Sequence, residues 1–102
     1  MKIVQKEFRV GTRRRTEMID ITSQVAGVVH ESGIRDGDVV VFCPHTTAAI
    51  TINEGADPSV QADILHYLAD QVPHQGSYRH REGNSDAHIK STLVGVSQTV
   101  PV

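Results

Sequence analysis

One short apolar run constrains this fold more than any other segment of the sequence. The residues from Asp38 to Pro44, DVVVFCP, form a continuous apolar stretch between turn-forming neighbours, and such a run predicts a buried strand. Aromatic residues make up only 4% of the chain and tryptophan is absent. The core must therefore be built from Val, Ile, Leu and Ala around this strand. At 102 residues we predict a single domain over 1–102, because a second core would not fit.

Alternation of polar and apolar residues predicts the other strands. The segments 2–12 and 16–22 alternate and flank a basic turn, which predicts an opening hairpin. The segment 46–53 alternates as well, and 97–102 resembles the start of a further strand without an evident partner. These segments predict a β-sheet built around the apolar run.

Capping residues and helical spacing predict the helices. The first helix covers 23–33, with Asp20 or Thr22 as its cap and Gly33 at its end. A helix over 59–72 begins after Asp57 and Pro58, and it places its apolar residues on one face: Val60, Ile64, Leu65, Leu68 and Val72. A third, short helix covers 87–95, capped by Ser85 or Asp86. The fold class that follows is α+β.

Charge and cysteine content exclude several classes of protein. Ten basic and twelve acidic residues give a formal net charge of −2, so nothing favours a nucleic acid or a membrane surface as partner. No run approaches the roughly 20 apolar residues of a membrane span. The single Cys43 cannot form an internal disulfide. We expect a cytoplasmic protein, with Cys43 as a small buried apolar residue.

The first group of candidate site residues follows the ends of two predicted strands. His45, Thr46 and Thr47 follow the apolar run, while Asn53, Glu54 and Asp57 follow the next strand. A loop that ends at a helix N-terminus favours anions, and carboxylates there could instead hold Mg²⁺ with its phosphate. The alternative is structural: Asp57 caps a helix, Glu54 is solvated and His45 packs against Pro44.

The second group lies in the polar stretch YRHREGNSDAHIK, and comprises Tyr78, Arg79, His80, Asn84, Asp86, His88 and Lys90. The spacing of His80 and His88 matches no zinc-finger pattern, so a polar surface loop is the alternative. On a helix, Lys90 would point away from the side that carries His88. We interpret His30, His66 and His74 as surface residues. The run Arg13–Arg15 is typical of a solvated turn, with an anion-binding rim as the alternative.

The segments PHTTAAITINEGADP and YRHREGNSDAHIKSTLVG, in this order, resemble the YjbQ family, whose members are described as secondary thiamine-phosphate synthase enzymes. The resemblance covers essentially the whole chain. It implies a bifurcated, antiparallel or mixed β-sheet that forms a barrel-like core, two to three short helices, and assembly as a homotrimer. Members continue past TVPV with further strands and a Gly-Thr-Trp-Gln motif, so we expect this domain to lack those C-terminal strands.

The resemblance also implies roles for the candidate residues. His45, Glu54, Asp57 and Lys90 are expected to be catalytic. Thr46, Thr47, Asn53 and Asn84 are expected to bind substrate. We expect Arg79 to join them, because its charge could stabilise departing pyrophosphate. A divalent metal, zinc or magnesium, is expected as cofactor, with His45, His80 and His88 as its ligands.

Three functions follow as hypotheses. The first is a weak thiamine-phosphate synthase-type transferase, which joins a pyrimidine diphosphate to a thiazole phosphate and releases pyrophosphate, the physiological substrate being left open. The second is a zinc-dependent hydrolase with His45, His80 and His88 as ligands and an open position for water. The third is a non-catalytic trimer that binds a phosphorylated metabolite.

Overall fold

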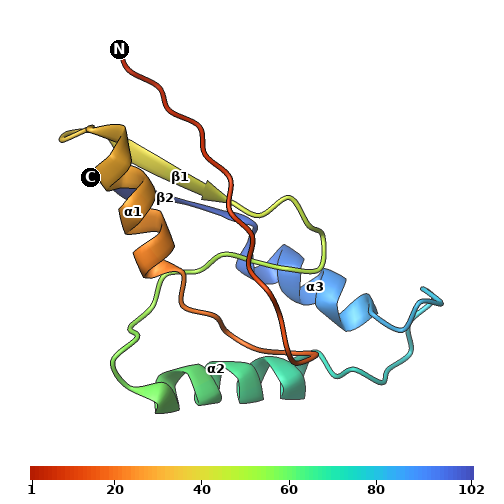
Figure 1. Ribbon diagram of the computed structural model, residues 1–102. Coiled ribbons are helices and arrows are strands. Elements are labelled where there is room, and N and C mark those ends of the chain that lie inside the picture. Colours follow the sequence, from red (N-terminus) through yellow and green to blue (C-terminus); the bar gives the residue numbers. More distant parts are fainter.

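The computed structural model describes residues 1–102 and has an α+β architecture of three helices and one two-stranded sheet (Figure 1). In chain order the elements are α1 (Thr22–Ser32), β1 (Asp38–Phe42), α2 (Pro58–Gln71), α3 (Ser85–Val94) and β2 (Ser97–Pro101). In Figure 1, α1 lies beside the sheet, α3 leads into β2, and α2 lies apart from the sheet on the other side of the molecule.

The apolar run does form a strand, and its partner is the last element of the chain. β1 pairs with β2 in antiparallel register, from Asp38 opposite Pro101 to Phe42 opposite Ser97. We had predicted no strand partner for 97–102, and that prediction was wrong. Val39 and Val41 are half-buried on one face of β1, whereas Val40 and Phe42 are 64% and 61% exposed on the other. The strand is thus covered on one face only.

The predicted opening hairpin is absent. Residues 2–12 and 16–22 have no regular structure apart from the first residue of α1, and 46–53 contains only a turn. These segments lack a ladder partner: Ile50 N–H donates to the Gly95 carbonyl at 3.0 Å, and the N-terminal segment is attached by a Lys6–Glu31 ion pair of 3.8 Å. Alternation selects the side on which a residue lies, but a strand also needs a neighbour for its hydrogen bonds.

The first two helices form where local signals place them. The predicted cap of α1 was wrong: Ile21 is the N-cap residue and makes no side-chain capping bond, although the Thr22 N–H donates to Asp20 Oδ1 at 2.9 Å. The predicted end is confirmed at Gly33, whose φ of 72° is left-handed. Asp57 caps α2 by accepting from the Ser59 N–H at 2.9 Å, and α2 ends before Pro73. The predicted apolar face of α2 is half-buried, with Val72 fully buried.

The predicted cap of α3 was wrong. Asn84 occupies the N-cap position, Ser85 is the first helical residue, and Asp86 lies within the first turn, where it is buried. The helix therefore starts earlier than the pattern of 87–95 indicates, because Asp86 is engaged in ion pairs rather than in capping.

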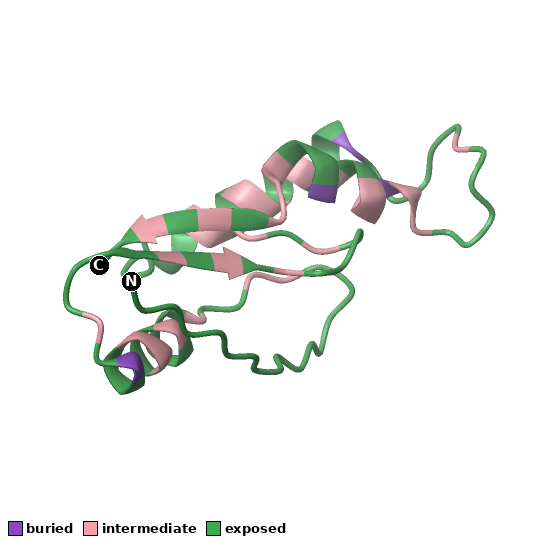
Figure 2. Ribbon diagram, turned by 90° about the horizontal axis from the view of Figure 1, so that it is seen from above, coloured by how far each residue is buried: buried purple, intermediate pink, exposed green.

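The chain buries little of itself. Only Ser32, Val72, Asp86 and Ser91 are buried (Figure 2), and Cys43 is half-buried rather than buried. The accessible surface is 8321 Å², whereas a compact protein of this mass exposes about 5,700 Å². The radius of gyration of 15.7 Å also exceeds the value of about 13 Å for a compact chain of this length. Roughly 2,600 Å² of additional surface is therefore open.

Two further observations limit the architecture. The sheet has two strands and is not closed. None of the three helices combines the length and the hydropathy that a membrane-spanning helix requires.

A cluster of ion pairs joins α3 to the turn at 13–17. The Asp86 side chain is 1% exposed and accepts two hydrogen bonds from the Arg15 guanidinium, at 2.9 and 2.8 Å. Lys90, one turn further along α3, donates to the same carboxylate at 3.2 Å. These bonds, those from Arg15 above all, hold the pKa of Asp86 well below its usual range although burial acts in the opposite direction.

We expect the substitution Gly→Ala to have opposite effects on stability at two glycines, one inside α1 and one at its end. Gly33→Ala places a Cβ at a φ of 72° and should lower the free energy of unfolding by about 1–2 kcal/mol. Gly27→Ala lies inside α1, where a Cβ meets no atom within 4 Å, and should raise it by about 0.5–1 kcal/mol. Urea unfolding of both variants measures the difference. Equal effects would contradict the left-handed end of α1.

The buried carboxylate predicts a pH-dependent stability. We expect Asp86→Asn to lower the free energy of unfolding near neutral pH by about 1–3 kcal/mol, because Arg15 and Lys90 lose their anionic partner. The pKa of Asp86 is lower in the folded than in the unfolded chain. Its contribution is therefore present above the ordinary carboxyl pKa and is lost as the pH falls toward the folded pKa.

The measurement is urea unfolding of wild type and Asp86→Asn between about pH 6 and about pH 3. The difference in stability should shrink over this range. Asp63→Asn, on the exposed side of α2 and without an ion pair, is the matched control and should show neither effect. A difference that does not change with pH would contradict the assignment.

Candidate functional site

The two sequence motifs meet at a hollow between α3 and the chain that leaves β1. The hollow has a volume of about 320 Å³, and it is lined by Thr46, His88, Ser91, Thr92, Gly95 and Val96. Ser91 and Thr92 lie three and four positions after His88, and Gly95 lies four and three positions after them, so these four residues share one side of the helix and its end. Thr46 comes from the turn after β1. This arrangement brings together Thr46 and His88, both of which were predicted.

The polar groups of the hollow divide into engaged and free ones. Ser91 Oγ donates to the Ala48 carbonyl at 2.6 Å, and Thr92 Oγ1 donates to the His88 carbonyl at 2.9 Å. By contrast, neither the His88 imidazole nor the Thr46 hydroxyl has a hydrogen-bond partner in the protein. His88 is half-buried. These two side chains are therefore the ones available to a ligand.

A second imidazole lies against His88. The ring centroids of His80 and His88 are 5.3 Å apart and the rings are perpendicular. His80 is 42% exposed, and its Nε2 lies 3.7 Å from Glu82 Oε2. Asn84, between the two histidines in sequence, makes no capping bond to α3, and its Oδ1 is buried without a partner. A buried acceptor without a donor is costly in a folded protein, but Asn84 is not among the residues that line the hollow.

The predicted metal ligands do not form a complete set within the single chain. His80 and His88 lie together, but His45 is exposed and does not join them. No group of three or more His, Cys, Asp or Glu side chains could hold a metal ion. The residues present thus do not fit a three-ligand zinc site, and the expected set stays a prediction.

Asn53 and Glu54 lie at a different cavity. They are among the residues that line a space of about 890 Å³ between α1, one face of the sheet and the segment 50–55. Glu54 has a single hydrogen bond, from its N–H to Asn53 Oδ1 at 2.8 Å. Asp57 caps α2, and the bonds from Ser59 lower the pKa of its carboxyl. No hydrogen bond or ion pair joins these residues to His80 or His88, and their expected roles stay predictions.

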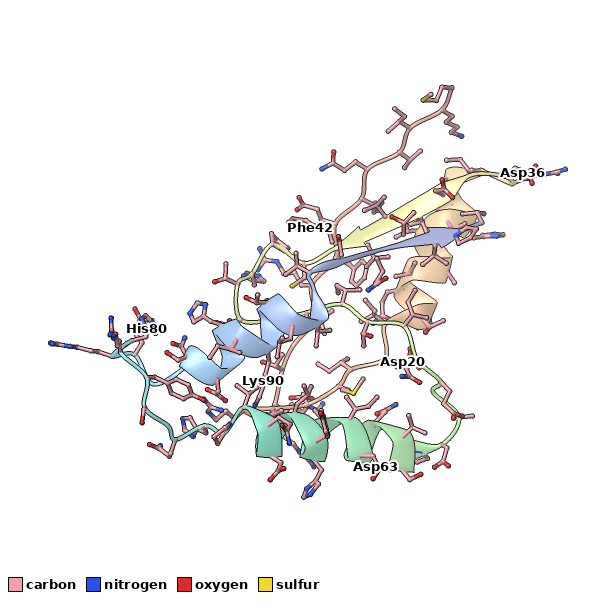
Figure 3. The ribbon with its side chains drawn as sticks, turned by 180° about the vertical axis from the view of Figure 1, so that it is seen from behind. Asp20, Asp36, Phe42, Asp63, His80 and Lys90 are labelled. Carbon is pink, nitrogen blue, oxygen red and sulfur yellow. The ribbon has the colours of Figure 1, made fainter.

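Lys90 faces the side of α3 opposite to the hollow. Its side chain is 14% exposed and its ammonium pairs with Asp86, one turn away on the same helix face. Figure 3 shows Lys90 on the side of α3 that faces α2, while His80 lies in the loop at the end of the molecule. Thr47 and Arg79 are exposed. The structure therefore separates Lys90 from His88, as their spacing on a helix predicted.

Two residues near the site were missed by sequence reasoning. Arg15 was interpreted as part of a solvated turn, yet its guanidinium reaches Asp86 and the Gly83 carbonyl. His74 is exposed, as predicted, but its contact with the same carbonyl, at 3.0 Å from its Nε2, was not predicted. Arg15 and Asp86 are 71 residues apart, and no local pattern in the sequence connects them.

Solved structures of known proteins share this fold. A YjbQ/UPF0047 family protein from Clostridium acetobutylicum superposes with a TM-score of 0.81 at 58% identity, over 82% of this chain and 65% of that protein. This chain thus spans less than two thirds of the Clostridium protein's length. A hypothetical protein from Aeropyrum pernix K1 superposes with a TM-score of 0.87 at 35% identity, over 91% of this chain and 70% of that one.

Curated relatives agree with the structures. A UPF0047 protein from Methanocaldococcus jannaschii is 50% identical over 94 residues, which cover 92% of this chain and 68% of the relative. The UPF0047 protein YugU from Bacillus subtilis is 48% identical over 98 residues, 95% of this chain and 74% of the relative. The family model described as UPF0047 protein YjbQ-like matches residues 6–102. The chain belongs to the YjbQ-like UPF0047 family.

Proposed function

We propose that the hollow beside α3 binds a phosphorylated small molecule and that His88 acts there as a general acid or base. The observation that carries this proposal is the His88 imidazole, half-buried and without a partner in the protein, next to the free hydroxyl of Thr46. A volume of about 320 Å³ lies at the lower end of the range for small-molecule sites. An imidazole titrates near physiological pH and can move a proton there.

The reaction that we propose is of the thiamine-phosphate synthase type. A pyrimidine diphosphate is joined to a thiazole phosphate, and pyrophosphate leaves with the electron pair of the broken carbon–oxygen bond. Negative charge grows on the leaving group, so donors aimed at it favour the transition state. The His88 imidazole and the Thr46 hydroxyl, which both line the hollow, can be such donors.

We further propose that the site is completed by assembly into a homotrimer in the cytoplasm. The roughly 2,600 Å² of additional open surface exceeds the area of about 800 Å² that each partner contributes to a standard interface. Subunit contacts would bury this surface and supply a barrel-like core. They would also allow His45, Glu54 and Asp57 to act at a pocket of a neighbouring subunit, together with a divalent ion, zinc or magnesium.

The reaction predicts a graded set of histidine variants. Purified protein supplied with the pyrimidine diphosphate, the thiazole phosphate and Mg²⁺ should form thiamine phosphate, measured by chromatography. His88→Ala should lower kcat by about 10²–10⁴-fold, the usual contribution of a general acid or base. His66→Ala on the exposed side of α2 is the control and should leave kcat unchanged.

The remaining outcomes separate the alternatives. His45→Ala should lower kcat if His45 enters the same pocket from a neighbouring subunit. Turnover that persists in His88→Ala would contradict the assignment of His88 as the general acid or base. Binding of pyrophosphate by the wild type without any turnover would leave a binding protein for phosphorylated metabolites.

Assembly predicts a defined mass in solution. We expect light scattering after size exclusion to give three times the chain mass of 11.1 kDa at micromolar concentration. Phe42→Glu puts a charge on the exposed face of β1 and should shift the mass toward the monomer if that face is an interface. A wild-type monomer at all concentrations would contradict the trimer.

A further inference from the structure

We infer that Arg15 is a positioning residue that holds the loop 79–83 in place and thereby sets His80 against His88. This inference rests on the proposed function of the hollow, because it assigns Arg15 a role in the same site. Arg15 does not line the hollow. Its effect on the imidazoles passes through Asp86 and Gly83.

The first step is the orientation of Arg15 itself. Glu17 Oε2 accepts from the backbone N–H groups of Arg13 and Arg14, both at 2.7 Å. These bonds close the turn around the carboxylate of Glu17 and lower its pKa. Such a carboxylate-centred turn fixes the backbone immediately before Arg15. The side chain of Arg15 leaves this turn toward α3.

The second step concerns the hydrogen bonds that Arg15 makes to α3 and to the loop before it. The guanidinium binds both oxygens of Asp86 in the first turn of α3. Arg15 Nη2, which donates to Asp86 Oδ1, also donates to the Gly83 carbonyl at 3.2 Å. His74 contacts the same carbonyl. A planar guanidinium is suited to such a two-sided contact and a lysine is not, because its donors lack the rigid fork.

The third step connects these hydrogen bonds to the positions of the His80 and His88 imidazoles. Gly83 has a left-handed φ of 77° and lies in the bend between His80 and Asn84. The loop 79–83 has no hydrogen bond to the body of the protein other than those at the Gly83 carbonyl. Fixing this carbonyl therefore fixes the position of His80, whereas His88 is fixed by α3. The 5.3 Å separation of the two rings follows from both constraints.

The experiment measures this separation directly. In labelled protein, ring protons of His80 and His88 should give a nuclear Overhauser effect in the wild type. Arg15→Met should abolish it while the amide signals of α1, β1 and β2 remain in place. Arg9→Met removes the same charge from an exposed side chain without hydrogen bonds, and it should retain the wild-type signal.

A conservative variant keeps the test decisive if Arg15→Met does not fold. Arg15→Lys retains the charge beside Asp86 but lacks the rigid fork that holds both Asp86 oxygens and the Gly83 carbonyl in one geometry, so the signal between the rings should weaken clearly. A full-strength signal in Arg15→Lys and in any folded Arg15→Met would overturn the inference.

Kinetics give a second readout that a merely structural role would not produce. Displacing His80 removes its edge contact with the ring of His88, the proposed acid or base, and a misplaced catalytic group reduces turnover more than binding. Arg15→Lys should therefore lower kcat by about 10–100-fold with KM nearly unchanged. A fall in the amount of folded protein would instead lower activity by the folded fraction alone. If the wild type forms no thiamine phosphate but the ring signal depends on Arg15, the proposed reaction fails and the inference stands.

Discussion

A buried carboxylate ties the turn at 13–17 to α3. Asp86 is 1% exposed, and an ionised group at such a position must be paired and hydrogen-bonded. The partner comes from 71 residues earlier in the chain, so the turn at 13–17 is tied to α3 although no sheet ladder joins the two. Breaking such a pair leaves an uncompensated charge, which makes it a strong constraint on geometry even where its net contribution to stability is small.

Apolar packing, by contrast, is left open in the single chain. The sheet presents Val40 and Phe42 outward, and α1 is separated from the inner face of the sheet by a cavity of about 890 Å³. A chain of this length normally buries enough surface to offset the entropy of ordering it. Here polar anchors fix local geometry, and the remaining apolar surface is available to further contacts.

The elements that could be predicted from the sequence are those with local causes. The cap and proline at Asp57 and Pro58 define the start of α2, and Gly33 defines the end of α1, because each acts within one helical turn. The strands predicted over 2–12 and 46–53 are absent for the opposite reason. Alternation indicates which side a residue faces, but the hydrogen-bond partner of a strand is a distant segment. In the site, Thr46 and His88 were predicted from their motifs. Arg15 was not, because its role depends on a contact that only the fold creates.

Helix α3 shows why the spacing of residues within a motif matters as much as their types. Asp86 and Lys90 lie one turn apart and face the anchor formed with Arg15, whereas His88, Thr92 and Gly95 follow the other side toward the hollow. A single ten-residue helix thus carries a structural face and a chemical face. A lysine and a histidine two positions apart cannot serve the same ligand on a helix. In the single chain Lys90 is engaged with Asp86, and it is His88 and Thr46 that line the hollow.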